Sequence, residues 1–308
     1  MIKAPEVYRV LVVDDEPDIH TLTKLTLRTM KYGNIPIKIT KALSGAEALE
    51  EMKAHPETAV VLLDVVMETQ SAGLDTCRAI REELKNNFTR IILRTGQPGI
   101  APERQVIEEY DIDGYLPKED LTTSKLYTSV RTAIKAYSEL IQLERHSEAL
   151  TIINDLSISL HSFDPLEVSL KQILDAVLKM APSPFAILNL ETFEHEGEPL
   201  NFLLHTSLDN DSETTKILAE KIILKVHENP SEKSLQEGGA FETGFIIPIK
   251  LHRSLGYGWL YIENNITDPL ILKLLPILAS HASNALYSSI AQKMLAERDE
   301  NSFDSITI

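Results

Sequence analysis

Five residues of this sequence have the side-chain types of a phosphoryl-transfer site, and each lies at the end of a short apolar run. Asp14 and Asp15 follow YRVLVV, Asp64 ends TAVVLLD, Thr95 ends RIILRT, and Lys118 follows DGYLP. Carboxylates are the ligands that Mg²⁺ prefers, and bound Mg²⁺ usually shares its shell with a phosphate. A carboxylate can also attack phosphorus, while a lysine and a hydroxyl bind the phosphoryl oxygens. The set predicts a phosphoryl acceptor with Asp64 as the nucleophile.

The elements that must position these residues alternate between apolar strands and amphipathic helices. Strands are expected at 8–13, 35–42, 58–64, 90–95 and 113–117, and helices at 18–30, 44–54, 73–85 and 101–110. Parallel strands need crossover helices, so this order predicts an α/β doubly wound sheet of five parallel strands. If the strand order is 2-1-3-4-5, the first and third strands are neighbours and their carboxyl ends bring the three aspartates together. Such close carboxylates need a counter-ion, which predicts bound Mg²⁺.

Residues 1–120 resemble the response-regulator receiver domain of two-component signalling, which has a flavodoxin-like fold. The resemblance implies that Asp64 is the phosphoacceptor and that Lys118 is the lysine of the site. It assigns Thr95 to the catalytic set and to the conformational switch, and Tyr115 to the switch. It also implies a sensor histidine kinase or a phosphotransfer protein as the phosphoryl donor. Such a protein signals by conformational change and binding and is not expected to be an enzyme.

The same resemblance implies a ligand set for the metal. These Mg²⁺ ligands are the side chains of Asp14, Asp15 and Asp64 and the backbone carbonyl of Val66. Two positions depart from the family pattern. Glu68 replaces the proline usually found four residues after the phosphoacceptor, and Glu119 replaces the proline that usually follows the lysine. Both departures leave the chemical groups in place and affect the surface formed by the fourth and fifth units.

A helical linker is expected over residues 121–160, because this stretch lacks Gly and Pro and its apolar residues recur at helical spacing. Its partial a/d stripe favours either a homodimeric coiled coil or a last helix of the first domain that runs into a linker. Residues 161–296 then predict helix, two strands, helix, two strands and a final helix, an α+β order. The tail, 297–308, is expected to be disordered.

The second domain, 161–296, resembles the GAF family in this order of elements. Stretches such as LRTGQPGIAPE also resemble a bacterial group in which a receiver and a GAF-like domain are often joined to an HD-GYP cyclic-di-GMP phosphodiesterase. The chain has no His-Asp pair, so that hydrolase is not expected here. Residues 121–308 lack a Cys for bilin attachment, and the cyclic-nucleotide motif of the GAF family is missing. A small ligand of this domain therefore stays unidentified.

Two alternatives to the response regulator stay open. The chain could be the regulatory half of a cyclic-di-GMP phosphodiesterase, which the reading frame past Ile308 would decide. It could also be a haloacid-dehalogenase-type phosphatase, although that family has Asp-x-Asp after its first strand and this chain has Asp14-Asp15-Glu16-Pro17.

Composition excludes several other classes. The 308 residues carry 30 Lys and Arg against 46 Asp and Glu, a net charge of -16, which argues against binding DNA. A single cysteine, Cys77, excludes an intramolecular disulfide and fits a reducing compartment. No apolar run approaches the ~20 residues of a membrane span, and no signal peptide is evident. The sequence thus predicts a cytoplasmic protein that binds neither DNA nor a membrane.

Overall fold

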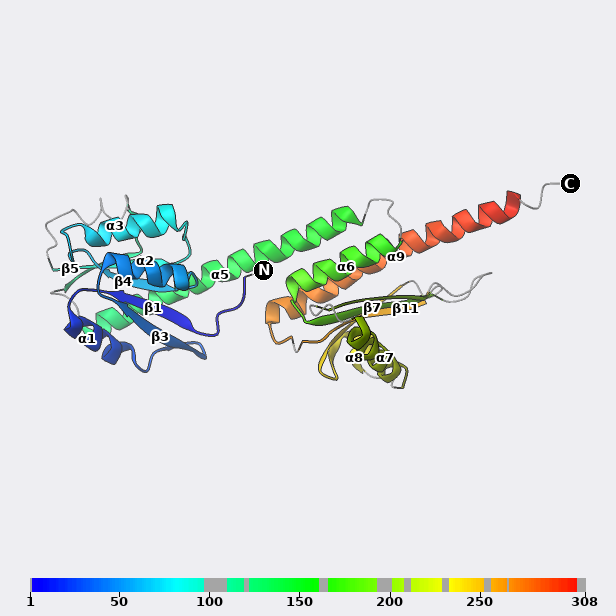
Figure 1. Cartoon of the computed structure of the whole chain (residues 1–308), viewed down its shortest axis with the longest axis horizontal. Helices are drawn as coiled ribbons and strands as arrows, with labels where there is room; N and C mark the ends of the chain where they lie inside the picture. Colours follow the sequence, from blue (N-terminus) through cyan, green and yellow to red (C-terminus); the bar gives the residue numbers. More distant parts are fainter. Residues whose placement is uncertain are drawn as a thin grey trace. The chain divides into compact units, whose positions relative to one another are not determined.

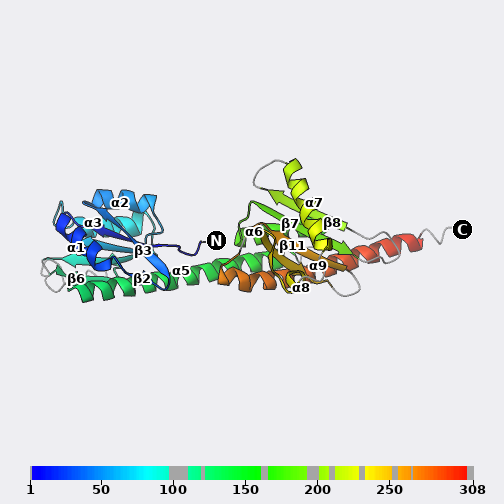
Figure 2. The same ribbon diagram turned by 90° about the horizontal axis from the view of Figure 1, so that it is seen from below.

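The structure is a computed structural model that describes residues 2–96, 110–118, 122–160, 166–192, 201–207, 212–228, 233–251, 256–264 and 266–303. The chain divides into two compact units, residues 2–145 and residues 146–308 (Figures 1 and 2). Each unit is built around a sheet of its own. We call them the N-terminal unit and the C-terminal unit.

The sheet of the N-terminal unit confirms the predicted parallel order. Its parallel strands are β1 (Tyr8–Val13), β3 (Ile35–Ala42), β4 (Val60–Asp64), β5 (Arg90–Thr95) and β6 (Gly114–Pro117), and the sheet order is β2-β3-β1-β4-β5-β6. The additional edge strand β2 (Lys31–Tyr32) pairs antiparallel with β3 and was not predicted. The turn between them contains Gly33 at φ 60, a backbone conformation that glycine adopts without steric cost.

Helices cover both faces of this sheet, which explains why its central strands are continuously apolar. Residues of β1 alternate between two cores, with Val10 and Val12 on one face and Leu11 and Val13 on the other. Helices α2 (Gly45–Ala54) and α3 (Ala72–Arg78), with the π-helical turn η1 (Ala79–Glu83), cover the second face. Helices α1 (Pro17–Leu27) and α5 (Thr123–Ser159) cover the first. The helix predicted at 101–110 lies outside the described residues except for Tyr110.

Helix α5 contributes to the cores of both units. Its N-terminal part packs on the sheet of the N-terminal unit. The side chains buried there are Leu126, Val130, Ala133, Ile134, Tyr137 and Ile141. Farther along, Ala149, Ile153 and Leu156 are buried in the C-terminal unit. The division between the units therefore falls inside α5, between Arg145 and His146, whereas the sequence placed the end of the first domain near residue 120. The sequence assigned the apolar stripe of α5 to a linker. In the N-terminal part of the helix, this stripe packs on the sheet of the N-terminal unit.

The C-terminal unit is an α+β fold, as predicted, with a five-stranded antiparallel sheet in the order β8-β7-β11-β10-β9. The strands are β7 (Phe185–Thr192), β8 (Asn201–Ser207), β9 (Gly239–Phe241), β10 (Gly244–Ile249) and β11 (Gly256–Ile262). One face packs on α5, α6 (Leu166–Met180) and α9 (Pro269–Phe303), and the other on α7 (Ser212–Glu228) and α8 (Lys233–Glu237) (Figure 1).

Helix α9 extends farther than the sequence suggested. It ends at Phe303, so the first part of the predicted disordered tail at 297–308 is helical. The stretch from Ala291 to Phe303 contains no Gly or Pro that would end a helix. The part of α9 at 269–290 is also long and apolar enough, by length and composition, to cross a membrane. Its side chains Leu275, Leu278, Ala282 and Leu286 lie in the core of the C-terminal unit, as expected for a core helix.

Candidate phosphoacceptor site

The predicted site residues meet at the carboxyl ends of the parallel strands. Asp14 follows β1 and Asp64 ends β4, and both carboxylates are buried, whereas Asp15 is exposed. One ligand oxygen from each of these aspartates lies within 4.8 Å of the others. The neighbouring strands β1 and β4 hold the two buried acids together, as the sequence predicted.

Lys118, which follows β6, connects the acids. Its Nζ donates to Asp64 Oδ2 at 2.8 Å and to Glu16 Oε1 at 3.0 Å, and it lies 3.4 Å from Asp14 Oδ2. Burial alone would lower the pKa of Lys118, but the hydrogen bonds and nearby carboxylates raise it above its ordinary value. The ammonium group therefore stays charged and offsets part of the negative charge of the cluster.

The carboxyl group of Asp64 has a pKa above its ordinary value, which results from opposing influences. Desolvation raises its pKa, the hydrogen bond and charge of Lys118 lower it, and the charge of Asp14 raises it again. Within the described part of the chain, Asp64 Oδ1 and Asp14 Oδ2 are buried and accept no hydrogen bond. Buried anionic oxygens without donors fit a hard divalent cation, so Asp14, Asp15 and Asp64 could hold Mg²⁺. Bound there, Mg²⁺ would neutralise charge on a phosphoryl group.

The remaining predicted residues lie around this cluster. Thr95 ends β5, is buried, and follows the residue that pairs with Asp64 across the sheet. Tyr115 is half-buried on β6 against the core under α2 and α3. Val66 is half-buried two residues after Asp64, and its assignment as a carbonyl ligand stays a prediction. The switch roles of Thr95 and Tyr115 also stay predictions.

The loop after Asp64 is fixed by two contacts. Glu68, which replaces the family's usual proline, accepts a hydrogen bond from the Gly45 backbone N–H at the start of α2, at 3.0 Å. A carboxylate at this end of a helix is favourable because the backbone N–H groups and the helix dipole attract it. Gly73 in α3 donates to the Val65 carbonyl at 3.1 Å, and a Cβ there would lie 2.0 Å from the Asp64 carbonyl oxygen. The end of β4 and the start of α3 thus approach at backbone distance.

Sequence reasoning missed two charged residues at the site. Glu16 accepts one of the hydrogen bonds of Lys118, and Arg94 is buried beside the acids. The acid that follows the Asp14-Asp15 pair was a usable signal for Glu16. A charge inside the apolar strand RIILRT was the signal for Arg94. Glu119 lies outside the described residues.

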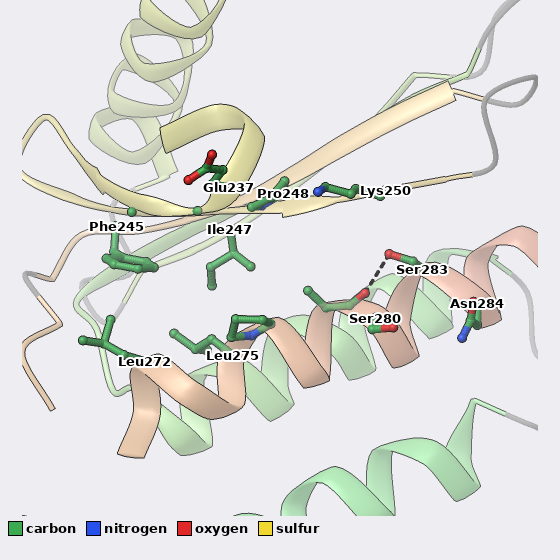
Figure 3. A pocket seen from close by; sticks show the side chains of 14 residues that line it. Glu237, Phe245, Ile247, Pro248, Lys250, Leu272, Leu275, Ser280, Ser283 and Asn284 are labelled. Carbon is green, nitrogen blue, oxygen red and sulfur yellow. Dashed lines mark hydrogen bonds between the residues drawn. The ribbon is translucent and has the colours of Figure 1, made fainter. Parts of the chain in front are cut away.

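The C-terminal unit has a cavity of about 550 Å³ between β10 and α9. Figure 3 shows Phe245 and Ile247 of β10 facing Leu272 and Leu275 of α9 across one end. At the other end the labelled side chains are polar, and they include Lys250, Ser280, Ser283 and Asn284. Ser283 Oγ donates to the Ala279 carbonyl at 2.7 Å. The cavity therefore has an apolar end and a polar end.

The sequence of residues 10–131 matches the family model of the response regulator receiver domain. With its parallel sheet and its cluster of aspartates and lysine, the N-terminal unit is a receiver domain of two-component signalling. The match is not to a phosphatase family, so the haloacid-dehalogenase alternative gains no support.

One curated relative is the 3'3'-cGAMP-specific phosphodiesterase 2 of Vibrio cholerae, which is 39% identical over 188 residues. These residues are 60% of this chain and 36% of the relative, so the chain spans about a third of that protein's length. Two solved receiver structures each cover 43% of this chain and are themselves 98% covered. The first is a response regulator receiver domain protein of Clostridium thermocellum, which is 24% identical with a TM-score of 0.37. The second is the signal receiver domain of an HD domain-containing protein of Pseudomonas fluorescens, which is 23% identical with a TM-score of 0.37.

Proposed function

We propose that this chain is a cytoplasmic response regulator that accepts a phosphoryl group on Asp64 from a sensor histidine kinase or a phosphotransfer protein. The observation that carries the proposal is that the two carboxylate oxygens of Asp64 have different surroundings. One oxygen is bound by Lys118 at 2.8 Å, and the other is buried beside Asp14 without a donor among the described residues. The second oxygen is thus available to attack phosphorus or to bind a cation.

The transfer uses the phosphohistidine of the donor and one proton from solvent. A carboxylate oxygen of Asp64 forms a bond to phosphorus while the P–N bond to the donor histidine breaks, and the imidazole nitrogen takes up a proton. Lys118 binds a phosphoryl oxygen, and Thr95 supplies a hydroxyl donor. On this proposal the protein has no turnover of its own beyond loss of the phosphoryl group, and it signals by binding.

Radiolabelled acetyl phosphate with Mg²⁺ tests the proposal directly. Wild-type protein should take up label that is lost in alkali, and Asp64→Asn should take up none. Asp75→Asn, which removes an exposed carboxylate on α3, is the matched control and should label like the wild type. Unlabelled wild-type protein would refute the function, and labelled Asp64→Asn would refute the site.

The C-terminal unit is proposed to be a GAF-like output domain. An antiparallel five-stranded sheet between helices supports this, together with the cavity between β10 and α9. The cavity suits a small amphipathic molecule, because it joins apolar side chains to Lys250 and Asn284. Anilinonaphthalene sulfonate is a suitable probe. Ser280→Trp, which fills the cavity from α9, should reduce its binding, while Ser288→Trp on the exposed surface of α9 should not.

A homodimer through α5 is also proposed. Leu143 and Leu150 lie one heptad apart on this helix and are 67% and 61% exposed. Exposed leucines at this spacing are typical of a coiled-coil seam. Sedimentation velocity of wild type and Leu150→Glu, with and without beryllofluoride, should show a dimer that the substitution weakens. A wild-type monomer under both conditions would refute the proposal.

The activity of the Vibrio cholerae relative supports a second candidate, regulation of a cyclic-dinucleotide phosphodiesterase. The support is the 39% identity to a 3'3'-cGAMP-specific phosphodiesterase. On this candidate the chain is a regulatory segment and does not itself cleave the nucleotide. Incubating the chain with 3'3'-cGAMP and divalent cations should therefore leave the nucleotide intact, and its hydrolysis would contradict this assignment.

A further inference from the structure

Arg94 carries a buried charge that has no hydrogen-bonding partner among the described residues. Its side chain is 1% exposed, and within the described part of the chain Nε, Nη1 and Nη2 donate to no acceptor. Two other arginines of this unit are well paired. Arg81 Nη1 donates to the carbonyls of Asn86 and Thr89 at 2.8 and 2.9 Å, and Arg90 Nη1 donates to Asp113 at 2.9 Å. A buried guanidinium without acceptors is costly, so Arg94 is suited to an acceptor that the described residues do not supply.

The position of Arg94 indicates which acceptor that is. Arg94 on β5 pairs with Asp64 on β4 in the parallel register, and neighbouring residues at the same level of a sheet point to the same face. Burial lowers the pKa of Arg94, and the carboxylates of Asp14, Asp64 and Glu16 oppose that shift. The guanidinium is therefore within electrostatic reach of the acids without being bonded to them.

Guanidinium donors and carboxylate oxygens that make no hydrogen bond among the described residues thus lie together at one site. Asp14 Oδ2 and Asp64 Oδ1 lack hydrogen bonds, as Arg94 does, yet they form no ion pair with it among the described residues. A metal ion can bind the carboxylate oxygens, but it cannot accept a hydrogen bond from the Arg94 guanidinium. Since no described residue accepts from Arg94, these observations point to an anion that enters the site.

We infer that Arg94 is a second cation of the phosphoacceptor site and binds an oxygen of the phosphoryl group on Asp64 together with Lys118. This inference rests on the proposed function. A phosphoryl group offers three acceptor oxygens, and a guanidinium donates to such oxygens with strong, charge-assisted bonds. Arg94 is a binding residue here and takes no part in proton transfer.

The inference predicts opposite effects on the two ligands of the site. Arg94 repels Mg²⁺ and attracts the phosphoryl group, so Arg94→Met should bind Mg²⁺ more tightly, by about threefold, and the phosphoryl group more weakly. Loss of a hydrogen bond to a charged group predicts at least a tenfold weaker affinity for beryllofluoride, an analogue of the phosphoryl group. A structural role for Arg94 would weaken both affinities together.

Calorimetric titration of the full chain provides the test. Mg²⁺ is titrated first, and beryllofluoride is then titrated at saturating Mg²⁺ for each protein. Arg90→Met, which removes the same charge from the other end of β5, is the matched control and should leave both affinities unchanged. Arg94→Lys keeps the charge with fewer donors and should fall between wild type and Arg94→Met for beryllofluoride.

Each outcome is decisive. Methionine fills the space of the stem without a buried charge, so the melting temperature of Arg94→Met without Mg²⁺ should match or exceed that of the wild type. If both affinities fall together, or if beryllofluoride affinity is unchanged in Arg94→Met, the inference is overturned. If wild-type protein itself binds no beryllofluoride, the proposed phosphoacceptor function fails instead.

Discussion

The two units differ in where they place charge. In the N-terminal unit, Asp14, Asp64, Arg94 and Arg145 are buried. In the described part of the C-terminal unit the buried polar residues are uncharged, namely Ser169, Ser183, Asn189 and Ser283. Buried charge is expensive unless it is paired or binds an ion. The buried charges of the N-terminal unit are consistent with the ionic ligand proposed for it, whereas the described part of the C-terminal unit buries only uncharged polar side chains.

Sheet type explains part of this contrast. The carboxyl ends of parallel strands collect at one edge, so residues from β1, β4, β5 and β6 can converge on one ligand. The antiparallel strands of the C-terminal unit alternate in direction, and its cavity is instead lined by residues along β10 and α9. The candidate site of the first unit thus lies at strand ends, and the cavity of the second unit lies along the sides of its elements.

The largest expected effect concerns Mg²⁺ and isolates the charged site. Asp15 is exposed, so Asp15→Asn should leave the stability of the metal-free protein unchanged. It should nevertheless lower Mg²⁺ affinity by more than about 100-fold, because loss of outer-shell groups already costs 10- to 100-fold at metal sites. Calorimetry measures both the affinity and the stoichiometry. Asp18→Asn, an exposed acid in the first turn of α1, is the control and should bind Mg²⁺ normally.

The second prediction uses one glycine from each unit. A Cβ at Gly73 would lie 2.0 Å from the Asp64 carbonyl oxygen, and a Cβ at Gly244 would lie 2.2 Å from the Ile262 carbonyl oxygen. Each Gly→Ala substitution should therefore cost about 3 kcal/mol of unfolding free energy, measured in urea. Of the two variants, only Gly73→Ala should also weaken Mg²⁺ binding, because Gly73 contacts the backbone of Asp64 at the end of β4.

The control for this pair is Gly114→Ala. A Cβ at Gly114 would meet its nearest atom, in Ile92, at 3.6 Å, which is ordinary contact. Its effect should stay within about 1 kcal/mol. Equal Mg²⁺ affinity in Gly73→Ala and wild type would show that the site tolerates movement of α3.

The grouping of the candidate site residues in the N-terminal unit could be predicted from the sequence because it depends on topology. Once the alternation of strands and helices is read, the ends of parallel strands must meet, and Asp14, Asp64, Thr95 and Lys118 follow. Side-chain conformations could not be predicted in this way. That Lys118 also binds Glu16 depends on its rotamer and on where α1 begins.

Other features depend on tertiary packing that no local pattern contains. The sequence predicted two strands before the final helix, but Gly239–Phe241 forms a further strand, β9, because Glu242 adopts φ 53 and turns the chain back along β10. The division of the chain inside α5 has the same origin. A continuous amphipathic helix gives no local signal of where it leaves one core and enters the next.

A smaller effect is expected for Asp64→Asn without metal. Burial raises the pKa of Asp64 above 3.8, so the native state holds this proton more tightly than the unfolded state. Ionisation of Asp64 therefore lowers the unfolding free energy as the pH rises from the ordinary carboxyl pKa through the raised pKa of the native state. The full cost applies at neutral pH. Asp64→Asn should be more stable than wild type by about 1–3 kcal/mol in EDTA at neutral pH.

The gain should disappear as the pH falls below the ordinary carboxyl pKa, where wild-type Asp64 is also neutral. Saturating Mg²⁺ should reverse the order, because it stabilises only the protein that binds it. Thermal unfolding across pH, with and without Mg²⁺, measures both. A wild type that is the more stable protein in EDTA at neutral pH would mean that the Lys118 hydrogen bond outweighs the desolvation of Asp64.

The smallest expected effect tests whether the two units communicate. Trp259 is the sole tryptophan, and it is buried on β11 against α7 and α8 of the C-terminal unit. Since α5 contributes to both cores, a shift of its first part on phosphorylation should reach this unit. Beryllofluoride with Mg²⁺ should then change Trp259 emission by about a few per cent, as expected for a population shift between two states.

Two variants separate communication from direct action of the reagent. Asp64→Asn should show no change in emission, and a change there would place the reagent in the C-terminal unit. Ser147→Pro breaks α5 at an exposed position, at a cost of about 3 kcal/mol. It should still bind beryllofluoride at Asp64 while the Trp259 response is lost. Retention of the response in Ser147→Pro would mean that the signal between the two units does not need a continuous helix.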